Sequence, residues 1–278
     1  MDTQLNDGAE YGSLPFDRFA VERWDYSESP ERDQDQWNAL AQSWLTMTHQ
    51  ERQPFWAVHV PYDSPPAGAG FLPSQEQIAR VLAPYQTIDE RNKLQYLVSH
   101  MHNPLWIRTC YATELQPTWE SILAAANSLN GGEVEEGAVV FDSEDLYRDC
   151  AEDWKTVFLR LPMLSDRQHY DNQLEWDLQH GGCEGHDDEA YSALHEAGIK
   201  EEQSIYVVDE EALRENLIKL IYVDYHGNVI WHNKIAPEHV TWYEAYYAAG
   251  GMLSWMEELI GDNRALLQPG AQIEGEDI

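Results

Sequence analysis

Basic residues are scarce in this sequence. Its 278 residues include 17 Lys and Arg but 50 Asp and Glu, so the formal net charge is -33. A chain this acidic repels the phosphates of nucleic acids and of anionic membranes. The same charge attracts basic proteins. We therefore expect a basic protein partner, no direct nucleic-acid binding and no membrane association.

Cysteines and long apolar runs are also scarce. The three cysteines, Cys110, Cys150 and Cys183, form an odd and widely spaced set, which argues against a disulfide framework and for a reducing compartment. Residues 1–5 do not resemble the start of a signal peptide, and no apolar run approaches the length of a membrane span. These absences predict a cytoplasmic protein.

The sequence does contain enough apolar area for a sizeable core, since hydrophobic residues make up 43% of it and 11 residues are Trp. In the first third, residues 37–45 place apolar side chains at helical spacing. Ser74-x-x-Gln77 and Thr87-x-x-Glu90 resemble capping boxes that open two further helices. The second of these helices is expected to bury Ile88, Leu94, Leu97, Val98 and Met101.

After residue 104, short apolar runs alternate with helical segments. Strands are predicted at 105–111, 138–141, 205–208, 217–223 and 229–235, and helices at 117–129, 240–247 and 253–260. This order predicts an α/β (or α+β) fold with a mixed-direction sheet of about five strands flanked by helices. We divide the chain into a mostly helical region packed on the body (1–102), an α/β domain (103–262) with an acidic insertion at about 143–203, and a tail (263–278).

Four segments of the second half fall in the order typical of one protein family. They are Leu105–Tyr111 followed by Thr118–Ile122, then Ile205–Asp209, Leu220–Asp224, and Ala236–Trp242 followed by Met252–Leu259. Together they resemble an uncharacterised bacterial domain-of-unknown-function family of compact α/β domains. The resemblance covers about residues 103–262, interrupted at about 150–200. It implies a fold and supplies no catalytic residues.

Three apolar runs end in Asp142, Asp209 and Asp224. If their strands were parallel, the carboxylates would gather at the edge where open α/β sheets bind ligands. Clustered carboxylates suit Mg²⁺ and metal-dependent hydrolysis or phosphoryl transfer, with Arg108 as the cation on a nearby strand. The competing interpretation makes Asp142 and Asp209 helix N-caps and Asp224 a turn residue, and we favour it.

A second metal pattern is His180-x₂-Cys183-x₂-His186. Zinc accepts His and Cys ligands, and His169, Asp187 and Cys150 are candidates for the fourth ligand. No C-x-x-C accompanies the pattern, so we favour a polar Gly-rich loop. The sequence therefore predicts no cofactor, with Mg²⁺ and Zn²⁺ as the alternatives.

The acidic excess is concentrated in the middle of the chain. Residues 133–215 contain 24 acidic and 6 basic residues, which is more than half of the net charge. Two tyrosines near the end of the chain share a helical face and suit a protein contact. The residues expected to bind the partner are Glu133, Glu135, Glu136, Asp145, Asp149, Asp187, Asp188, Glu189, Tyr243 and Tyr247.

No catalytic motif accompanies this charge. The sequence lacks a G-x-S-x-G elbow, a P-loop and an H-E-x-x-H pair. We therefore expect a non-enzymatic interaction module that binds or inhibits a basic protein, as an inhibitor or immunity-like protein does. The alternatives are a metal-dependent hydrolase or phosphoryl-transfer enzyme and a mimic of DNA.

Overall fold

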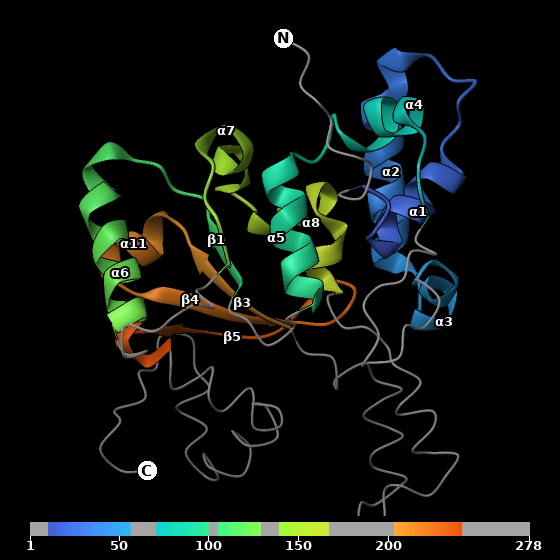
Figure 1. Ribbon diagram of the computed structural model, residues 1–278. Coiled ribbons are helices and arrows are strands. Elements are labelled where there is room, and N and C mark those ends of the chain that lie inside the picture. Colours follow the sequence, from blue (N-terminus) through green and yellow to red (C-terminus); the bar gives the residue numbers. More distant parts are fainter. Residues whose placement is uncertain (1–10, 57–70, 100–104, 129–138, 167–202, 241–278) are drawn as a thin grey trace, which may run out of the picture. The chain divides into compact units, whose positions relative to one another are not determined.

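The computed structural model describes residues 11–56, 71–99, 105–128, 139–166 and 203–240 (Figure 1). These residues form two compact units: 11–99 with 157–166, and 105–156 with 203–240. The segment expected to be one insertion at 143–203 is thus divided, because its residues up to 156 belong to the second unit and 157–166 belong to the first. The predicted closing helices and tail lie outside the described residues.

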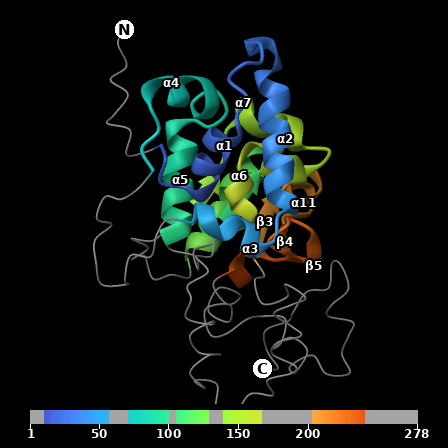
Figure 2. The same cartoon turned by 90° about the vertical axis from the view of Figure 1, so that its right-hand side faces the viewer.

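Helices build the first unit. The α-helices are α1 (Pro15–Arg23), α2 (Asp33–Thr46), α3 (His49–Arg52), α4 (Gln75–Gln77), α5 (Ile88–Ser99) and α8 (Val157–Arg160). Shorter 3₁₀ and π segments are η1 (Pro30–Arg32), η2 (Gln53–Phe55), η3 (Ile78–Leu82) and η7 (Pro162–Ser165). Helix α2 contacts both α1 and α8, as Figure 2 illustrates for α1. In the described part of the chain, no helix is long and apolar enough to cross a membrane.

The sequence patterns of this unit are largely confirmed. Helix α2 buries Trp37, Ala41 and Trp44, as its apolar spacing predicts. Both capping boxes form: the hydroxyls of Ser74 and Thr87 each accept a bond from the backbone N–H three residues later, at 3.2 Å. The expected burial of Ile88 is wrong, because this first residue of α5 is 40% exposed. The inner face of α5 begins one turn later.

A five-stranded sheet with the order β2-β1-β3-β4-β5 forms the centre of the second unit. The strands are β1 (Leu105–Arg108), β2 (Val139–Phe141), β3 (Gln203–Val208), β4 (Ile218–Val223) and β5 (Val229–Ile235). Strand β1 pairs in parallel with β2 and β3, whereas β4 is antiparallel to β3 and β5. The predicted mixed-direction α/β sheet is therefore confirmed.

Helices α6 (Gln116–Ser128) and α11 (Glu210–Glu215) pack on one face of this sheet (Figure 1). Trp106 and Tyr206, which are neighbours in register, stack with ring centroids 5.1 Å apart in the middle of that face. Trp119 and Ile122 of α6 and Leu213 of α11 complete the same apolar cluster. The short helix α7 (Glu144–Tyr147) follows β2 and continues into the 3₁₀ turn η5 (Arg148–Cys150).

Buried ion pairs join distant segments of the helical unit. Asp17 accepts hydrogen bonds from the backbone of Gly12 and from Arg91, whose Nη1 lies 2.9 Å from Oδ1. Arg52 and Asp166 pair at 2.7 Å, and both side chains are at most 2% exposed. Burying a charge is costly unless it is paired and hydrogen-bonded, so these contacts fix which segments meet.

Breaking one of these pairs should destabilise the helical unit. In Asp166→Asn, the buried Arg52 charge loses the Asp166 carboxylate, and we expect the free energy of unfolding to fall by about 3 kcal/mol. The matched control is Asp89→Asn, which removes the exposed partner of Lys93 and should cost less than about 1 kcal/mol. Urea unfolding followed by tryptophan fluorescence measures both. Equal effects of the two substitutions would contradict the structural role of the buried pair.

Candidate interaction site at the carboxyl edge of the sheet

The three strand-end aspartates do not meet. Because β1, β2 and β3 run parallel, Arg108, Asp142 and Asp209 reach the same edge of the sheet. Strand β4 runs the other way, so Asp224 lies at the opposite edge. The nine residues between β3 and β4 are fewer than the dozen or so that a parallel crossover needs, and this signal was present in the sequence.

Arg108 is the last residue of β1, which lies between β2 and β3, and is only 4% exposed. Its Nε donates to the Cys110 carbonyl and its Nη2 to Gln116 Oε1, both at 2.8 Å. The guanidinium also lies 4.6 Å from the centre of the Tyr111 ring and 5.3 Å from that of Trp119. Hydrogen bonds and aromatic faces therefore hold this cation in one position.

Asp142 is the carboxylate that Arg108 faces. The closest approach of the two side chains is 3.4 Å, and Trp119 Nε1 donates to Asp142 at 3.0 Å. Asp142 therefore does not cap α7 as expected, since its oxygens are bound on the α6 side. Burial raises the pKa of Tyr111, and the nearby Asp142 charge raises it further. The Tyr111 hydroxyl stays protonated and donates to the Arg108 carbonyl at 2.8 Å.

Asp209 and Asp224 have the roles that their local sequence predicts, a helix N-cap and a turn residue. Asp209 caps α11 by accepting from the Ala212 N–H at 2.9 Å, and Lys219 pairs with it at 2.5 Å. Asp224 accepts from the backbone N–H groups of His226 and Asn228 in the hairpin turn. Each carboxylate thus already has a partner that satisfies it.

Among the described residues, no group of three or more His, Cys, Asp or Glu is placed to hold a metal ion. His180, Cys183 and His186 lie outside these residues. Cys110 and Cys150 are both buried, and no disulfide joins them.

A shallow groove of about 440 Å³ lies at this edge, and we call it the edge groove. Its lining is formed by Ala151, Asp209, Glu210, Glu211, Arg214, Glu215 and Lys219. Four of these seven residues are acidic and two are basic. The sequence analysis missed the three glutamates, although Glu211 and Glu215 stand one helical turn apart directly after a strand.

Arg214 pairs with Glu210 in the edge groove at 2.6 Å, and two lysines pair with the other glutamates. Lys219 and Lys234 are directly opposite in the β4–β5 register, where like charges destabilise a sheet. Glu211 lies between them, 2.6 Å from one Nζ and 2.9 Å from the other, and Glu215 takes the second lysine at 2.6 Å. The hydrogen bonds from Lys219 and then Lys234 lower the pKa of Glu211 to about 2.

Next to the groove runs an acidic segment, residues 144–153, whose five carboxylates are all exposed. Glu144 pairs with Arg148, and Asp153 accepts from the Lys155 backbone at 3.1 Å. The other three have no ion pair within the described residues; they are Asp145, Asp149 and Glu152. Because Ala151 lines the groove, the segment borders it directly.

Nearly all Lys and Arg side chains in the described part of the chain form ion pairs with its own Asp and Glu residues. Twelve of the 14 described bases form ion pairs with carboxylates, some of them with two. Arg23 and Lys155 are the two exceptions. Few described bases are therefore left for the unpaired carboxylates of the acidic segment.

Two residues of the predicted partner surface, Asp145 and Asp149, lie in the acidic segment. The remaining predicted contacts lie outside the described residues, so the structure neither gathers nor separates them. These are Glu133, Glu135, Glu136, Asp187, Asp188, Glu189, Tyr243 and Tyr247.

The comparisons with known proteins add no assignment: no protein-family model, curated protein or solved structure matches this chain. The resemblance of residues 103–262 to an uncharacterised bacterial family therefore stays a prediction.

The lowered pKa of Glu211 predicts a pH-dependent contribution to stability. The pKa is about 2 in the folded protein against the usual 4.5, so the folded state favours the charged form. Its contribution is fully present above about pH 4.5 and is lost as the pH falls toward 2. Glu211→Gln should therefore lower the urea midpoint at pH 7, and the difference from wild type should shrink below pH 4.5. Glu238→Gln, at an exposed acid without an ion pair among the described residues, is the control and should show no such trend.

Proposed function

We propose that this protein is a non-enzymatic acidic binding module that engages a basic partner protein, in the manner of an inhibitor or immunity-like protein. The observation that carries the proposal is the unpaired acidic segment. Asp145, Asp149 and Glu152 are exposed without ion pairs, while nearly every described base is already bound to a carboxylate. These acids are therefore available to cations of a partner protein.

The edge groove gives such a partner a place for a side chain. A Lys or Arg stem that enters it would lie near the carboxylates of Glu210 and Glu215 on α11 and would share them with Arg214 and Lys234. Long-range attraction by the net charge of -33 would raise the rate of encounter, and contacts in the groove would fix the register. Binding should therefore weaken with ionic strength.

The two alternatives have less support. A metal-dependent hydrolase using Asp142, Asp209 and Asp224 needs carboxylates that converge, but these lie at two edges of the sheet, and two of them pair with Arg108 and Lys219. A DNA mimic needs rows of carboxylates that follow a phosphate backbone. The acidic segment offers three unpaired carboxylates beside a groove, which suits a local protein contact better.

The first test is an affinity pull-down at low and high salt, followed by titration of the recovered basic protein. Replacing the three unpaired acids together (Asp145→Asn, Asp149→Asn, Glu152→Gln) should weaken the complex at least about tenfold at low salt, because close charge pairs at interfaces contribute 1.5 kcal/mol or more. The matched control removes the same charge from exposed acids of the helical unit (Glu28→Gln, Glu31→Gln, Glu76→Gln). It should change the affinity by less than about threefold. Equal losses in the two triple variants would contradict a local site.

The second test concerns metal. We expect that a chelator leaves the affinity for the basic partner unchanged, because none of the proposed contacts uses a metal ion. Asp142→Asn should likewise leave binding intact. Calorimetric titration with and without EDTA measures both. A Ca²⁺- or Mg²⁺-dependent activity that Asp209→Asn abolishes, with the fold retained by circular dichroism, would overturn the proposal in favour of the hydrolase.

A further inference from the structure

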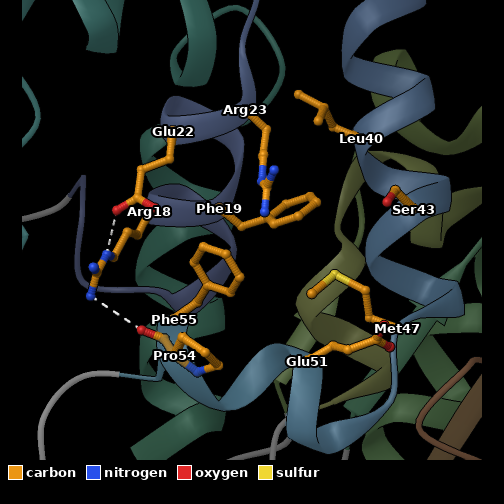
Figure 3. Close-up of a pocket in the computed structure, with 10 residues that line it drawn as sticks. All are labelled: Arg18, Phe19, Glu22, Arg23, Leu40, Ser43, Met47, Glu51, Pro54 and Phe55. Atoms are coloured by element: carbon orange, nitrogen blue, oxygen red, sulfur yellow. Dashed lines mark hydrogen bonds and ion pairs between the residues drawn. The ribbon is translucent and has the colours of Figure 1, made fainter.

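The helical unit contains a larger groove, of about 740 Å³, between α1, α2 and the α3–η2 turn (Figure 3). We call it the helical groove. It is lined by Arg18, Phe19, Glu22, Arg23, Leu40, Ser43, Met47, Glu51, Pro54 and Phe55. Its volume lies in the range of small-molecule sites, which are mostly apolar with a few placed polar groups.

Aromatic packing fixes the apolar floor of this groove. The rings of Phe19 and Phe55 meet edge to face at 5.2 Å and 87°, and Phe19 also packs against Trp44 at 5.4 Å. Both phenylalanines keep only a small exposed area, and Leu40 and Met47 are half-buried at its side. The floor is therefore formed before any ligand arrives, which reduces the ordering cost of binding.

Three of the four charged residues around this floor are already engaged. Arg18 pairs with Glu22 at 2.6 Å and donates to the Pro54 carbonyl at 3.2 Å. Glu51 accepts from the Thr48 backbone N–H at 2.8 Å and from its hydroxyl at 2.9 Å. These bonds, the backbone one first, lower the pKa of Glu51 and keep it ionised.

Arg23 is the exception. It is exposed and forms no ion pair or hydrogen bond within the described residues, and Figure 3 shows its side chain beside Phe19, directed into the space between α1 and α2. The sequence explains why no acid neutralises it. Phe19 and Ser27 occupy the positions four residues away, and the adjacent Glu22 carboxylate is taken by Arg18.

We propose that the helical groove binds a small apolar monocarboxylate, with the carboxylate on Arg23 and the aliphatic or aromatic body on Phe19, Phe55 and Met47. A guanidinium offers paired N–H donors that match a carboxylate. Glu22 and Glu51 lie at the same groove and disfavour a ligand with a second negative charge. The net charge of the chain repels anions generally, so a bound anion reports a local site.

The test uses decanoate, its neutral analogue decanamide and isothermal titration calorimetry on the full chain. We expect saturable 1:1 binding of decanoate and at least about tenfold weaker binding of decanamide, because a hydrogen-bonded charge contact is worth roughly 1.5–3 kcal/mol. Arg23→Gln should lose about the same factor for decanoate and leave decanamide unchanged. The matched control is Lys155→Gln, at the other unpaired described base, which should bind decanoate as wild type does.

A second variant tests the apolar part of the helical groove separately from the charge of Arg23. Met47→Glu should weaken decanoate and decanamide alike, because it places a carboxylate at the apolar body of either ligand. Three results would overturn the proposal: unchanged decanoate binding in Arg23→Gln, equal losses in Arg23→Gln and Lys155→Gln, or binding of a peptide with an apolar C-terminal residue but not of decanoate. Unchanged urea midpoints would show that the variants are folded.

Discussion

Pairing of a small number of cations with a large number of carboxylates is the constraint on which both units depend. In the helical unit, Arg91 reaches Asp17 across 74 positions of the sequence, and Arg52 reaches Asp166 across 114. Arg160 bonds Glu90 with both Nε and Nη2, at 2.6 and 2.7 Å. Each of these acids is nearly fully buried, so it can stay charged only where its arginine meets it. Apolar packing supplies the driving force for folding, and the ion pairs restrict which helices come together.

In the second unit, the same chemistry acts at the surface. The carboxyl edge of a parallel sheet is where ligand sites commonly form, yet here Arg108 and Lys219 occupy it and neutralise Asp142 and Asp209. In the edge groove beside it, carboxylates pair with basic side chains of the same unit. The acids without ion pairs lie next to the edge groove in the acidic segment. The proposed recognition of a basic partner by charge rests on this arrangement.

Local sequence patterns predicted the helices and strands well. Most features that they missed depend on contacts between residues far apart in the sequence. The spacing of Trp37, Ala41 and Trp44 predicts α2, and the Ser74 and Thr87 capping boxes predict where two helices begin, because all of these depend on neighbours within a few residues. The edge of the sheet at which Asp224 lies depends on the direction of β4. The edge groove is lined both by Ala151 and by residues of α11, which lies nearly sixty residues further along the chain. No sequence spacing predicts such a contact. The free state of Arg23 likewise follows only from knowing that Arg18 takes Glu22.

Lys219 and Lys234 share the Glu211 carboxylate. Substitutions of paired and of unpaired charged residues should therefore have unequal effects on the stability of this protein. Loss of an unpaired surface acid relieves repulsion and leaves no group without a partner. Loss of Lys234 would leave Glu215 without its cation, and loss of Lys219 would leave Asp209, the cap of α11, without its cation. Glu211 would keep the other lysine in each case. The unpaired surface acids of this protein can therefore vary more freely over time than its paired acids and bases, and its strong negative charge can persist without each of these surface acids being needed.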